Sequence, residues 1–256
     1  MNLSDIGSAI VTGGASGLGR ATATALADAG VRIALLDRDA DRGTAAARDL
    51  GALFVETDVT DPASVASGLA AASAANGPAR LCVNCAGIAP GAKTIDRDGA
   101  AHDPALFARA VSVNLTGTFN MATQAAAAMA MLDPVGADGE RGLIVNTASI
   151  AAYEGQIGQI AYAASKGGVA AMTLPMARDL ARSGIRVMAV APGLFLTPML
   201  EGLPEEVQTS LGAQVPYPPR LGKPSEFAAL VLHMVENPMM NGEVIRLDGA
   251  IRLAPK

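Results

Sequence analysis

Three side chains in the middle of the chain have the types and spacing to move a proton. Tyr162 lies four residues before Lys166, so on a helix both side chains would project from one face. Ser149 closes the apolar run that precedes them. A phenol beside an ammonium can donate and accept a proton, and a serine hydroxyl can hydrogen-bond to the same substrate oxygen. The spacing therefore predicts acid–base chemistry on an oxygen atom.

The charge of the lysine is expected to act on the tyrosine. A free tyrosine has a pKa of about 10, which is too high for ready proton exchange near neutral pH. A positive charge ~5 Å away, at an effective dielectric constant of about 20, is worth roughly 3 kcal/mol, or about 2 pKa units. We therefore expect Lys166 to lower the pKa of Tyr162. Taken alone, a Tyr-x-x-x-Lys pair can equally be a solvated helix face.

A glycine-rich turn near the start of the chain offers a place for phosphate. The apolar run 9–11 leads into Gly13-x-x-x-Gly17-x-Gly19 and then into an alanine-rich helix at 21–29. Glycines let the backbone approach a ligand closely, and the first turn of a helix presents free N–H groups to an anion. The spacing differs from G-x-G-x-x-G and lacks the Gly-Lys-Ser/Thr of a triphosphate loop. A purely structural turn is the alternative.

An acidic residue at the end of the next strand bears on the choice of cofactor. Asp37 closes the run 32–37, twenty residues after Gly17. A carboxylate there can accept hydrogen bonds from both hydroxyls of an adenosine ribose and would repel a 2′-phosphate. Arg38 follows directly and can receive such a phosphate, but Asp37 would lie closer, so we predict NAD. Asp58 can either hydrogen-bond to an adenine amino group or cap a turn.

Strand patterns alternate with helix-length segments along the whole chain. Strands that are apolar through their length are typical of a parallel sheet covered by helices on both faces. No linker, repeat or change of composition divides residues 1–256, so we predict one doubly wound α/β Rossmann domain of about seven strands. Ligands of such sheets bind beyond the carboxyl ends of the strands. The predicted strands are 9–11, 32–37, 52–56, 81–84, 142–147, 185–190 and 243–247.

The segments between these strands differ in character. A long helix is predicted from about 104 to 132, with Asn114 in its middle, where an amide can divert a backbone hydrogen bond. The helix that carries Tyr162 should run to about Arg182. The proline-rich segment 194–224 is predicted to be a mobile, partly helical flap over the substrate. Its apolar side chains are Leu194, Phe195, Leu196, Met199, Leu200 and Leu203.

Composition limits the class of protein. Half of the 256 residues are hydrophobic and the formal net charge is −5, which gives no basic footprint for nucleic acid. We see no secretory leader and no run long enough to span a bilayer, so a cytoplasmic location is expected. Cys82 and Cys85 form a C-x-x-C without further Cys or His nearby. We predict reduced packing cysteines, with Cys85 near a ligand, and no metal site.

Taken together, these motifs resemble the short-chain dehydrogenase/reductase family over nearly the whole chain. The residues that carry the resemblance are Thr12-Gly-x-x-x-Gly-x-Gly19, Asn84-Cys-Ala-Gly87, Asn114, Ser149, Tyr162-x-x-x-Lys166 and Pro192-Gly193. The commoner family motif has Asn at the position of Cys85. This departure resembles the group of type 2 3-hydroxyacyl-CoA dehydrogenases, also described as 17β-hydroxysteroid dehydrogenases type 10. Asn114-Leu-x-Gly-Thr-Phe-Asn120 and Asn241–Arg252 match that group as well.

The resemblance implies a role for each motif residue. Tyr162 would be the general acid and base, Ser149 would polarise the substrate carbonyl, and Lys166 would also bond the nicotinamide ribose. Asn114 would interrupt its helix and hold a water that links Lys166 to solvent. Substrate would contact Ser149, Gln159 and Tyr162. The cofactor-binding set implied is Gly13, Ser16, Gly17, Leu18, Gly19, Asp37, Asp58, Val59, Asn84, Cys85, Ala86, Gly87, Tyr162, Lys166, Pro192, Gly193, Phe195 and Thr197.

The expected activity is NAD-dependent hydride transfer between a 3-hydroxyacyl-CoA and a 3-ketoacyl-CoA, in fatty acid metabolism. Two alternatives are open for Lys93 and Arg97: one of them contacts the phosphates of coenzyme A, or both are solvated. An alternative substrate is a hydroxysteroid or another apolar secondary alcohol, which the flap would suit equally. A non-catalytic dinucleotide-binding scaffold is less favoured, since all four motif residues are present. A serine hydrolase lacks its Gly-x-Ser-x-Gly elbow. The family resemblance implies a homotetramer, with residues 250–256 against a neighbour.

Overall fold

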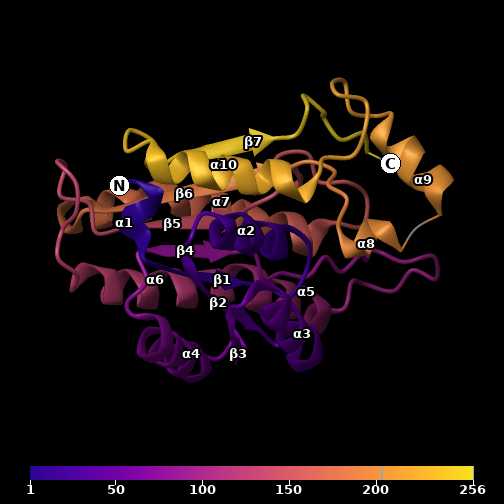
Figure 1. Ribbon diagram of the computed structural model, residues 1–256. Helices are drawn as coiled ribbons and strands as arrows, with labels where there is room; N and C mark the ends of the chain where they lie inside the picture. The colour runs from indigo at the N-terminus through magenta and orange to yellow at the C-terminus, as the bar shows by residue number, and fades with distance from the viewer. Residues whose placement is uncertain (203, 256) are drawn as a thin grey trace.

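The computed structural model describes residues 1–202 and 204–255, so Leu203 of the predicted flap and the terminal Lys256 lie outside the described residues. The predicted doubly wound fold is confirmed: one sheet of seven parallel strands has the order β3-β2-β1-β4-β5-β6-β7 (Figure 1). The order reverses between β1 and β4, and open sheets of this kind bind their ligands at the carboxyl edge beside such a reversal. The strands are β1 (Ser8–Thr12), β2 (Arg32–Asp37), β3 (Leu53–Glu56), β4 (Leu81–Asn84), β5 (Gly142–Thr147), β6 (Ile185–Pro192) and β7 (Val244–Leu247).

Alternate residues of the strands feed two apolar layers. Val11 of β1 packs in the cluster that includes Leu26 and Phe227, whereas its neighbour Ile10 packs in the cluster that includes Met121 and Ala177. This alternation follows from the pleat of a strand. One face is covered by α2 (Gly17–Asp28), α3 (Ala40–Leu50) and α10 (Pro224–Glu236), and the other by α4 (Pro62–Asn76), α6 (Gly117–Ala130) and α7 (Ile160–Leu180).

The predicted long helix is divided into three parts. It consists of α5 (Pro104–Val111), a π-helical turn η1 (Ser112–Thr116) and α6, and Asn114 lies in the π turn. Such turns replace the usual backbone bonds locally and are frequent at functional sites. The helix α7 ends at Leu180, and the next residues form a 3₁₀ turn η3 (Ala181–Ser183). The irregularity expected at Asn114 in the middle of the helix predicted from 104 to 132 is therefore seen, as a π turn.

The segments beyond the carboxyl edge of the sheet would enclose a ligand. The predicted flap contains α8 (Pro198–Glu201) and α9 (Glu205–Gly212), which lie at the end of the molecule opposite α1 (Leu3–Ile6) in Figure 1. Its two ends are held together, because Leu196 N donates to Gly222 O at 2.8 Å and Gly222 N donates to Leu194 O at 2.8 Å. The helices α8 and α9 confirm that the predicted flap is partly helical.

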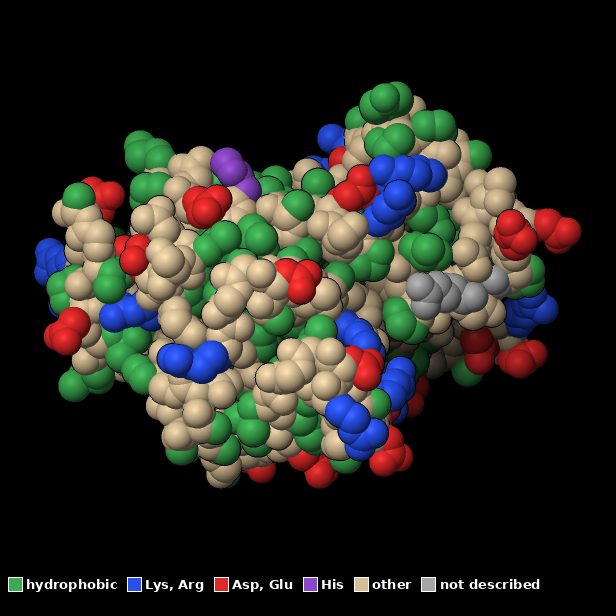
Figure 2. Space-filling view, viewed as in Figure 1, with side chains coloured by type: hydrophobic (Ala, Val, Ile, Leu, Met, Phe, Trp, Pro, Cys, Tyr) green, Lys and Arg blue, Asp and Glu red, His purple; other side chains and the backbone are tan. Residues whose placement is uncertain are grey.

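The surface carries charges of both signs. In the view of Figure 2, acidic and basic side chains are interspersed with apolar ones over the whole face. In the described part of the chain, no helix combines the length and apolarity needed to cross a bilayer. Nor do the described residues contain a group of three or more His, Cys, Asp or Glu side chains placed to hold a metal ion.

Candidate active site

Tyr162 and Lys166 share one face of α7, as the spacing predicts. The Nζ of Lys166 is 5.9 Å from the centre of the Tyr162 ring and donates to the carbonyl oxygen of Thr147 at 2.6 Å. Thr147 is the last residue of β5, so this bond holds the helix against the end of the sheet. Lys166 is buried, and burial lowers its pKa from the ordinary 10.5 to about 8.

The pKa of Tyr162 moves opposite to the direction we expected. Burial raises it, and a side-chain hydrogen bond with Ser149 opposes the rise. Desolvation of the phenolate is thus the largest influence on this pKa, and the lowering expected from Lys166 together with oxidised nicotinamide stays a prediction. Ser149 lies just beyond β5, and its Oγ accepts from the backbone N–H of Ala151 at 3.1 Å. Its hydroxyl proton remains available for a second partner.

Asn114 uses its side chain to join three segments. Its Oδ1 accepts from Ile88 N at 2.8 Å, and its Nδ2 donates to Ile88 O at 2.8 Å and to Ser165 Oγ at 2.9 Å. Ser165 in turn donates to the carbonyl oxygen of Tyr162 at 2.7 Å. The carbonyl oxygen of Asn114 accepts from Thr118 Oγ1 at 2.7 Å. The fully buried amide therefore fixes α7 against the segment after β4.

Gly87 marks the point where the catalytic candidates meet the cofactor candidates. A Cβ on this residue would lie 3.1 Å from Asn114 Oδ1 and 3.6 Å from Lys166 Nζ. A larger side chain would therefore press on both groups. The glycine of the Asn84–Gly87 motif leaves the space that these two side chains occupy.

The glycine-rich turn has the geometry of a phosphate cradle. Gly13 and Gly17 adopt φ of +62° and +53°, which favour glycine. A Cβ on Gly13 would lie 2.7 Å from Ala86 N, and one on Gly19 would overlap the carbonyl oxygen of Gly13. The helix α2 begins at Gly17, four residues before the predicted start, so the free N–H groups of its first turn lie inside the motif. The N-cap residue Ser16 makes no capping hydrogen bond through its side chain.

Asp37 is held in place at the end of β2. Its Oδ2 accepts from Ala15 N at 3.1 Å, and its Oδ1 accepts from Asp39 N at 3.1 Å. The first bond ties the carboxylate directly to the glycine-rich turn. Each oxygen can accept a further hydrogen bond, so the group can still receive ribose hydroxyls. The structure thus brings two of the predicted cofactor-binding elements together.

Asp58 and Val59 form the turn after β3. Asp58 Oδ1 accepts from both the backbone N and the Oγ1 of Thr60, at 2.9 Å and 2.8 Å. These bonds lower the pKa of Asp58, since they favour its charged form. The turn-capping interpretation of Asp58 is therefore the one with contacts in the structure. The side chain of Val59 is buried, and its carbonyl oxygen accepts from Asn120 Nδ2 at 3.0 Å.

Asn84 and Cys85 connect neighbouring strands at the switch point. Asn84 Nδ2 donates to Asn146 Oδ1 at 2.9 Å, and Thr147 Oγ1 donates to Cys85 Sγ at 3.5 Å. Cys82 and Cys85 are free, and burial raises the pKa of their thiols to about 12 and about 11. Both thiols are therefore neutral and suited to packing, as the sequence predicts.

Thr12 fixes the backbone of the residues that follow β4. Its Oγ1 accepts from the N–H groups of both Cys85 and Ala86 at 3.2 Å. The end of β1 is thereby joined to the Asn84–Gly87 motif, on the side of the sheet edge where the glycine-rich turn lies.

The segment after β6 contributes contacts of two kinds. Pro192 ends the strand, and Gly193 packs so closely that a Cβ would lie 2.9 Å from the Cα of Asp248. The Phe195 ring is buried and fills the space beside Gly222, so only the backbone of Phe195 remains for a cofactor. A Cβ on Gly17 would be 3.6 Å from Thr197, which places the start of the flap beside the glycine-rich turn.

Gln159 lies at the rim of a hollow next to the catalytic helix. Its Oε1 accepts from Gln156 N at 3.0 Å. The hollow has a volume of about 570 Å³ and is also lined by Lys93, Ala163 and Pro255. Gln159 lies at the start of α7. Among the described residues, no hydrogen bond joins its side chain to Ser149 or Tyr162.

Three hydroxyl residues at the site were given no role from the sequence, although Thr12 opens the glycine-rich motif. Thr12 and Thr147 each end a strand, and Ser165 directly precedes Lys166. All three are buried, and each makes a polar contact described above. For Thr12, the signal that the sequence offers is a threonine at the end of a strand beside a glycine motif. For the other two, the signal is proximity to Ser149 and to Lys166.

Comparison with known proteins agrees with this geometry. The family profile described as short chain dehydrogenase matches residues 8–208. Human 3-hydroxyacyl-CoA dehydrogenase type-2 is 52% identical over 250 residues, covering 96% of this chain and 95% of the relative. The Drosophila melanogaster enzyme of the same name is 51% identical over 249 residues, covering 96% and 97%.

Solved structures give the same result. The 3-hydroxyacyl-CoA dehydrogenase type-2 of Mycobacterium avium superposes with a TM-score of 0.93 at 44% identity, covering 98% of both chains. An actinorhodin polyketide ketoreductase variant, solved with NADPH, superposes with a TM-score of 0.85 at 30% identity, covering 98% of this chain and 99% of the other. The sequence match and the shared fold lead to one conclusion: this chain belongs to the short-chain dehydrogenase family and is an oxidoreductase.

Proposed function

We propose that this enzyme interconverts a 3-hydroxyacyl-CoA and a 3-ketoacyl-CoA with NAD as its cofactor, within fatty acid metabolism. The observation that carries the proposal is the convergence of Ser149, Tyr162 and Lys166 at the sheet edge that also holds the glycine-rich turn. Relatives that share about half of the sequence are named for this activity, and the substrate class is taken from them.

The residues present fit a dinucleotide. The N-terminal turn of α2 and the close approach of Gly13 and Gly19 form a cradle that side chains would fill, and Ser16 Oγ is available beside it. Asp37 lies where adenosine ribose hydroxyls would be received. Lys166 and Thr197 would border the nicotinamide end. When bound, the reduced nicotinamide supplies the hydride, and the protein supplies binding, orientation and the proton.

The protein's own groups would act on the substrate oxygen. Ser149, which hydrogen-bonds to Tyr162 in this structure, would instead donate its hydroxyl proton to the carbonyl oxygen of a bound substrate and polarise the carbonyl group. Tyr162 would give its phenolic proton to the same oxygen as negative charge develops there. A raised pKa keeps the phenol protonated, which suits the donor role in ketone reduction. Lys166, with its ammonium near the ring, would stabilise the phenolate left behind.

In the reverse direction, Tyr162 would accept the alcohol proton. Its pKa must then fall, and the nearby cation of Lys166 favours the phenolate more strongly once the site excludes water. The buried lysine, with a pKa of about 8, would still be mostly charged near neutral pH. Asn114 would hold the surrounding backbone in place through its three side-chain bonds.

A second substrate class has a specific observation in its favour. The flap contributes Leu194 to an apolar cluster with Ile150 and Val215, beside the predicted substrate position. Ile150 and Val215 are themselves buried, so an apolar substrate would meet the flap residues Leu194, Leu196 and Leu200, which would suit a hydroxysteroid or another apolar secondary alcohol as well as an acyl chain. Turnover rates separate the two possibilities: acetoacetyl-CoA with NADH should give a kcat/KM at least about tenfold above that for a ketosteroid. A higher value for the ketosteroid would favour the second class.

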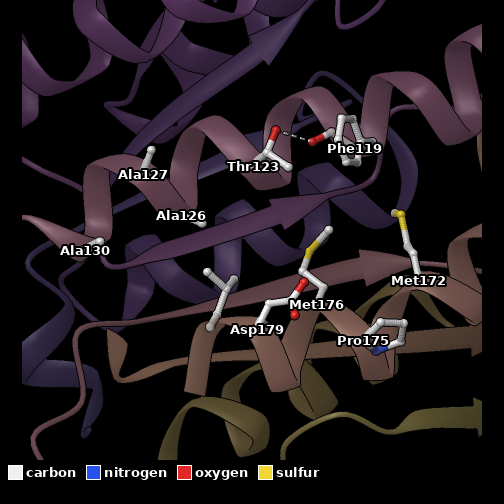
Figure 3. Close-up of a pocket in the computed structure, with 10 residues that line it drawn as sticks. Phe119, Thr123, Ala126, Ala127, Ala130, Met172, Pro175, Met176 and Asp179 are labelled. Carbon is white, nitrogen blue, oxygen red and sulfur yellow. Dashed lines mark hydrogen bonds between the residues drawn. The ribbon is translucent and has the colours of Figure 1, made fainter. Parts of the chain in front are cut away.

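A homotetramer is proposed as the assembly. The helix α6 contains no charged residue, and a groove of about 460 Å³ runs between it and α7. Figure 3 shows side chains of both helices around this groove, with Phe119 on α6 across from Met172 and Pro175 on α7. Phe119 is 49% exposed although it is a large apolar side chain. A largely apolar face of this kind, in which Asp179 is the charged residue among those that line the groove, supports burial against another copy. The cytoplasmic location stays a prediction from the sequence.

A further inference from the structure

Arg246 on β7 is the centre of a cluster of polar contacts near the candidate active site. Its Nη1 and Nη2 donate to the two carboxylate oxygens of Glu154 at 2.6 Å and 2.8 Å. Its Nε donates to Asp248 Oδ2 at 2.8 Å, and its Nη2 also reaches Ile251 O at 3.2 Å. The guanidinium lies 5.3 Å from the centre of the Tyr153 ring. The planar guanidinium group of Arg246 thus joins β7 to Glu154 and to the segment from Asp248 to Ile251.

Two of these segments border the predicted reaction centre. Glu154 belongs to the connection between Ser149 and Tyr162, and the next residue, Gly155, packs so closely that its Cβ would lie 3.0 Å from the Cβ of Ala163. Asp248 lies against Gly193 at the end of β6. Arg246 therefore links the connection between Ser149 and Tyr162 to the turn after β6. Arg252, which is more exposed, also reaches Glu154 at 3.6 Å and Asp248 at 3.0 Å, without the bidentate contact that Arg246 makes.

The end of the described chain strengthens the same connection. Gln156 Nε2 donates to Ala254 O at 3.0 Å, and Ile157 N donates to Pro255 O at 3.0 Å. Ile150, directly after Ser149, packs with Ile251 and neighbours. The connection between the serine and the tyrosine is thus held along its whole length by residues that follow β7.

The geometry and chemistry of the Arg246–Glu154 pair make it more than a surface contact. Both side chains are about one quarter exposed, and the contact is bidentate. Hydrogen bonding to Arg246 lowers the pKa of Glu154, so the pair stays charged at neutral pH. A fork-to-carboxylate contact restricts orientation as well as distance, which a single point charge does not.

We infer that Arg246 is a positioning residue for the reaction, acting through Glu154 and Asp248 to fix the segment between Ser149 and Tyr162 relative to the turn at Gly193. It contacts neither proposed reacting group. Its effect is on the relative placement of the serine hydroxyl and the phenol, and a displacement of about 1 Å there can reduce turnover by up to about 100-fold. The inference rests on the proposed function for its activity assay only.

A matched control exists at the opposite end of the strands from the candidate active site. Arg186, the second residue of β6, donates from Nε to Glu140 Oε1 at 2.7 Å and from its other nitrogens to carbonyl oxygens at the end of α10, including Met234 O at 2.7 Å. It is an arginine centre of the same kind, more deeply buried, but at the amino ends of the strands. Its loss should affect stability and leave the site in place.

The experiment compares Arg246→Lys, Glu154→Gln, their double variant and Arg186→Lys. We expect each of the first two to lower kcat with acetoacetyl-CoA and NADH about 10-fold, with the Kd for NADH, from fluorescence titration, within about twofold of the parent. The double variant should lose little more than either single one, because both remove one contact. Arg186→Lys should lower the Tm at least as much and keep kcat within about twofold.

Amide hydrogen exchange gives a readout that does not need the substrate. Peptides covering residues 150–159 should exchange faster than in the parent in Arg246→Lys and Glu154→Gln. In Arg186→Lys their exchange rate should equal that of the parent. If Arg246→Lys keeps its kcat and its exchange while only the Tm falls, the inference is overturned. If the parent enzyme does not turn over acetoacetyl-CoA, the proposed substrate fails. The exchange data then still decide the inference, faster exchange supporting it and unchanged exchange refuting it.

Discussion

Lys166 donates from Nζ to the carbonyl oxygen of Thr147 at 2.6 Å, which joins the middle of α7 to the last residue of β5. The lysine is 4% exposed, and the hydrogen bond with this neutral acceptor does not fully replace its hydration. Burial therefore lowers its pKa to about 8. The same bond places the ammonium beside the phenol of Tyr162.

The lowered pKa of Lys166 predicts a pH dependence of stability. In the unfolded chain the group has its ordinary pKa of 10.5, so between about pH 8 and 10.5 the unfolded state binds more protons than the folded state. The contribution of Lys166 to the free energy of unfolding then rises with pH across this window, by roughly 3 kcal/mol in total. Urea unfolding of the parent and of Lys166→Met should show a difference that grows from pH 7.5 to pH 10. A difference that stays flat would contradict the pKa.

Replacing the phenol should remove turnover and keep cofactor binding. In Tyr162→Phe the ring remains but no proton can be given to the substrate oxygen, so we expect kcat for acetoacetyl-CoA to fall about 10³-fold. The Kd for NADH should stay within a few-fold of the parent. Tyr217→Phe is a control, since Tyr217 is 80% exposed and lies outside the proposed site. Near-parental activity of Tyr162→Phe would refute the acid–base role.

The carboxylate of Asp37 should select NADH over NADPH. A 2′-phosphate placed near this fixed acid would be repelled, so we expect kcat/KM for NADH to exceed that for NADPH by at least about 100-fold. Asp37→Ser should reduce this ratio at least about tenfold, with Arg38 then free to receive the phosphate. Asp41→Ser, on the exposed first turn of α3, is the matched control. Equal values for the two cofactors in the parent enzyme would rule out the assignment.

The amide of Asn114 should matter for stability in proportion to its contacts. Asn114→Ala leaves Ile88 and Ser165 without three hydrogen bonds in a buried place, so we expect a loss of about 3–5 kcal/mol in the free energy of unfolding. Asn120→Ala is a control on the same helical stretch, because its amide is also buried and its one described bond goes to Val59 O. Its loss should be about 1–2 kcal/mol by urea unfolding. Equal losses would mean that the three bonds are not the cause.

The sequence was sufficient where spacing alone determines geometry. Positions i and i+4 of any helix face one way, so Tyr162 and Lys166 could be placed together without tertiary information. Likewise, Gly13 and Gly17 follow a buried strand, and their positive φ values follow from the need for a tight turn. The seven strands were found because each is apolar through most of its length, although several boundaries differ by one or two residues.

Properties that depend on competing environments could not be read from spacing. The sign of the pKa shift of Tyr162 depends on its burial, which the sequence does not give. The π turn at Asn114 depends on partners at Ile88 and Ser165, which come from distant segments. The same holds for Arg246, whose partner Glu154 lies 92 residues away in the chain. The packing of the Phe195 ring against Gly222, 27 residues later in the chain, could not be read from the sequence either, and its place beside the nicotinamide stays a prediction.

The largely apolar face between α6 and α7 predicts how the proposed homotetramer can be disrupted. Phe119→Asp would place a charge on an exposed aromatic position of this face, and burying that charge without a partner in an interface is costly. By sedimentation velocity we expect the parent to run as a tetramer and Phe119→Asp to run as a smaller species. Ile95→Asp is the control, since Ile95 is 60% exposed but lies in the loop after β4. A parent enzyme that sediments as a monomer, or a Phe119→Asp variant that stays tetrameric, would show that this face does not hold the assembly together.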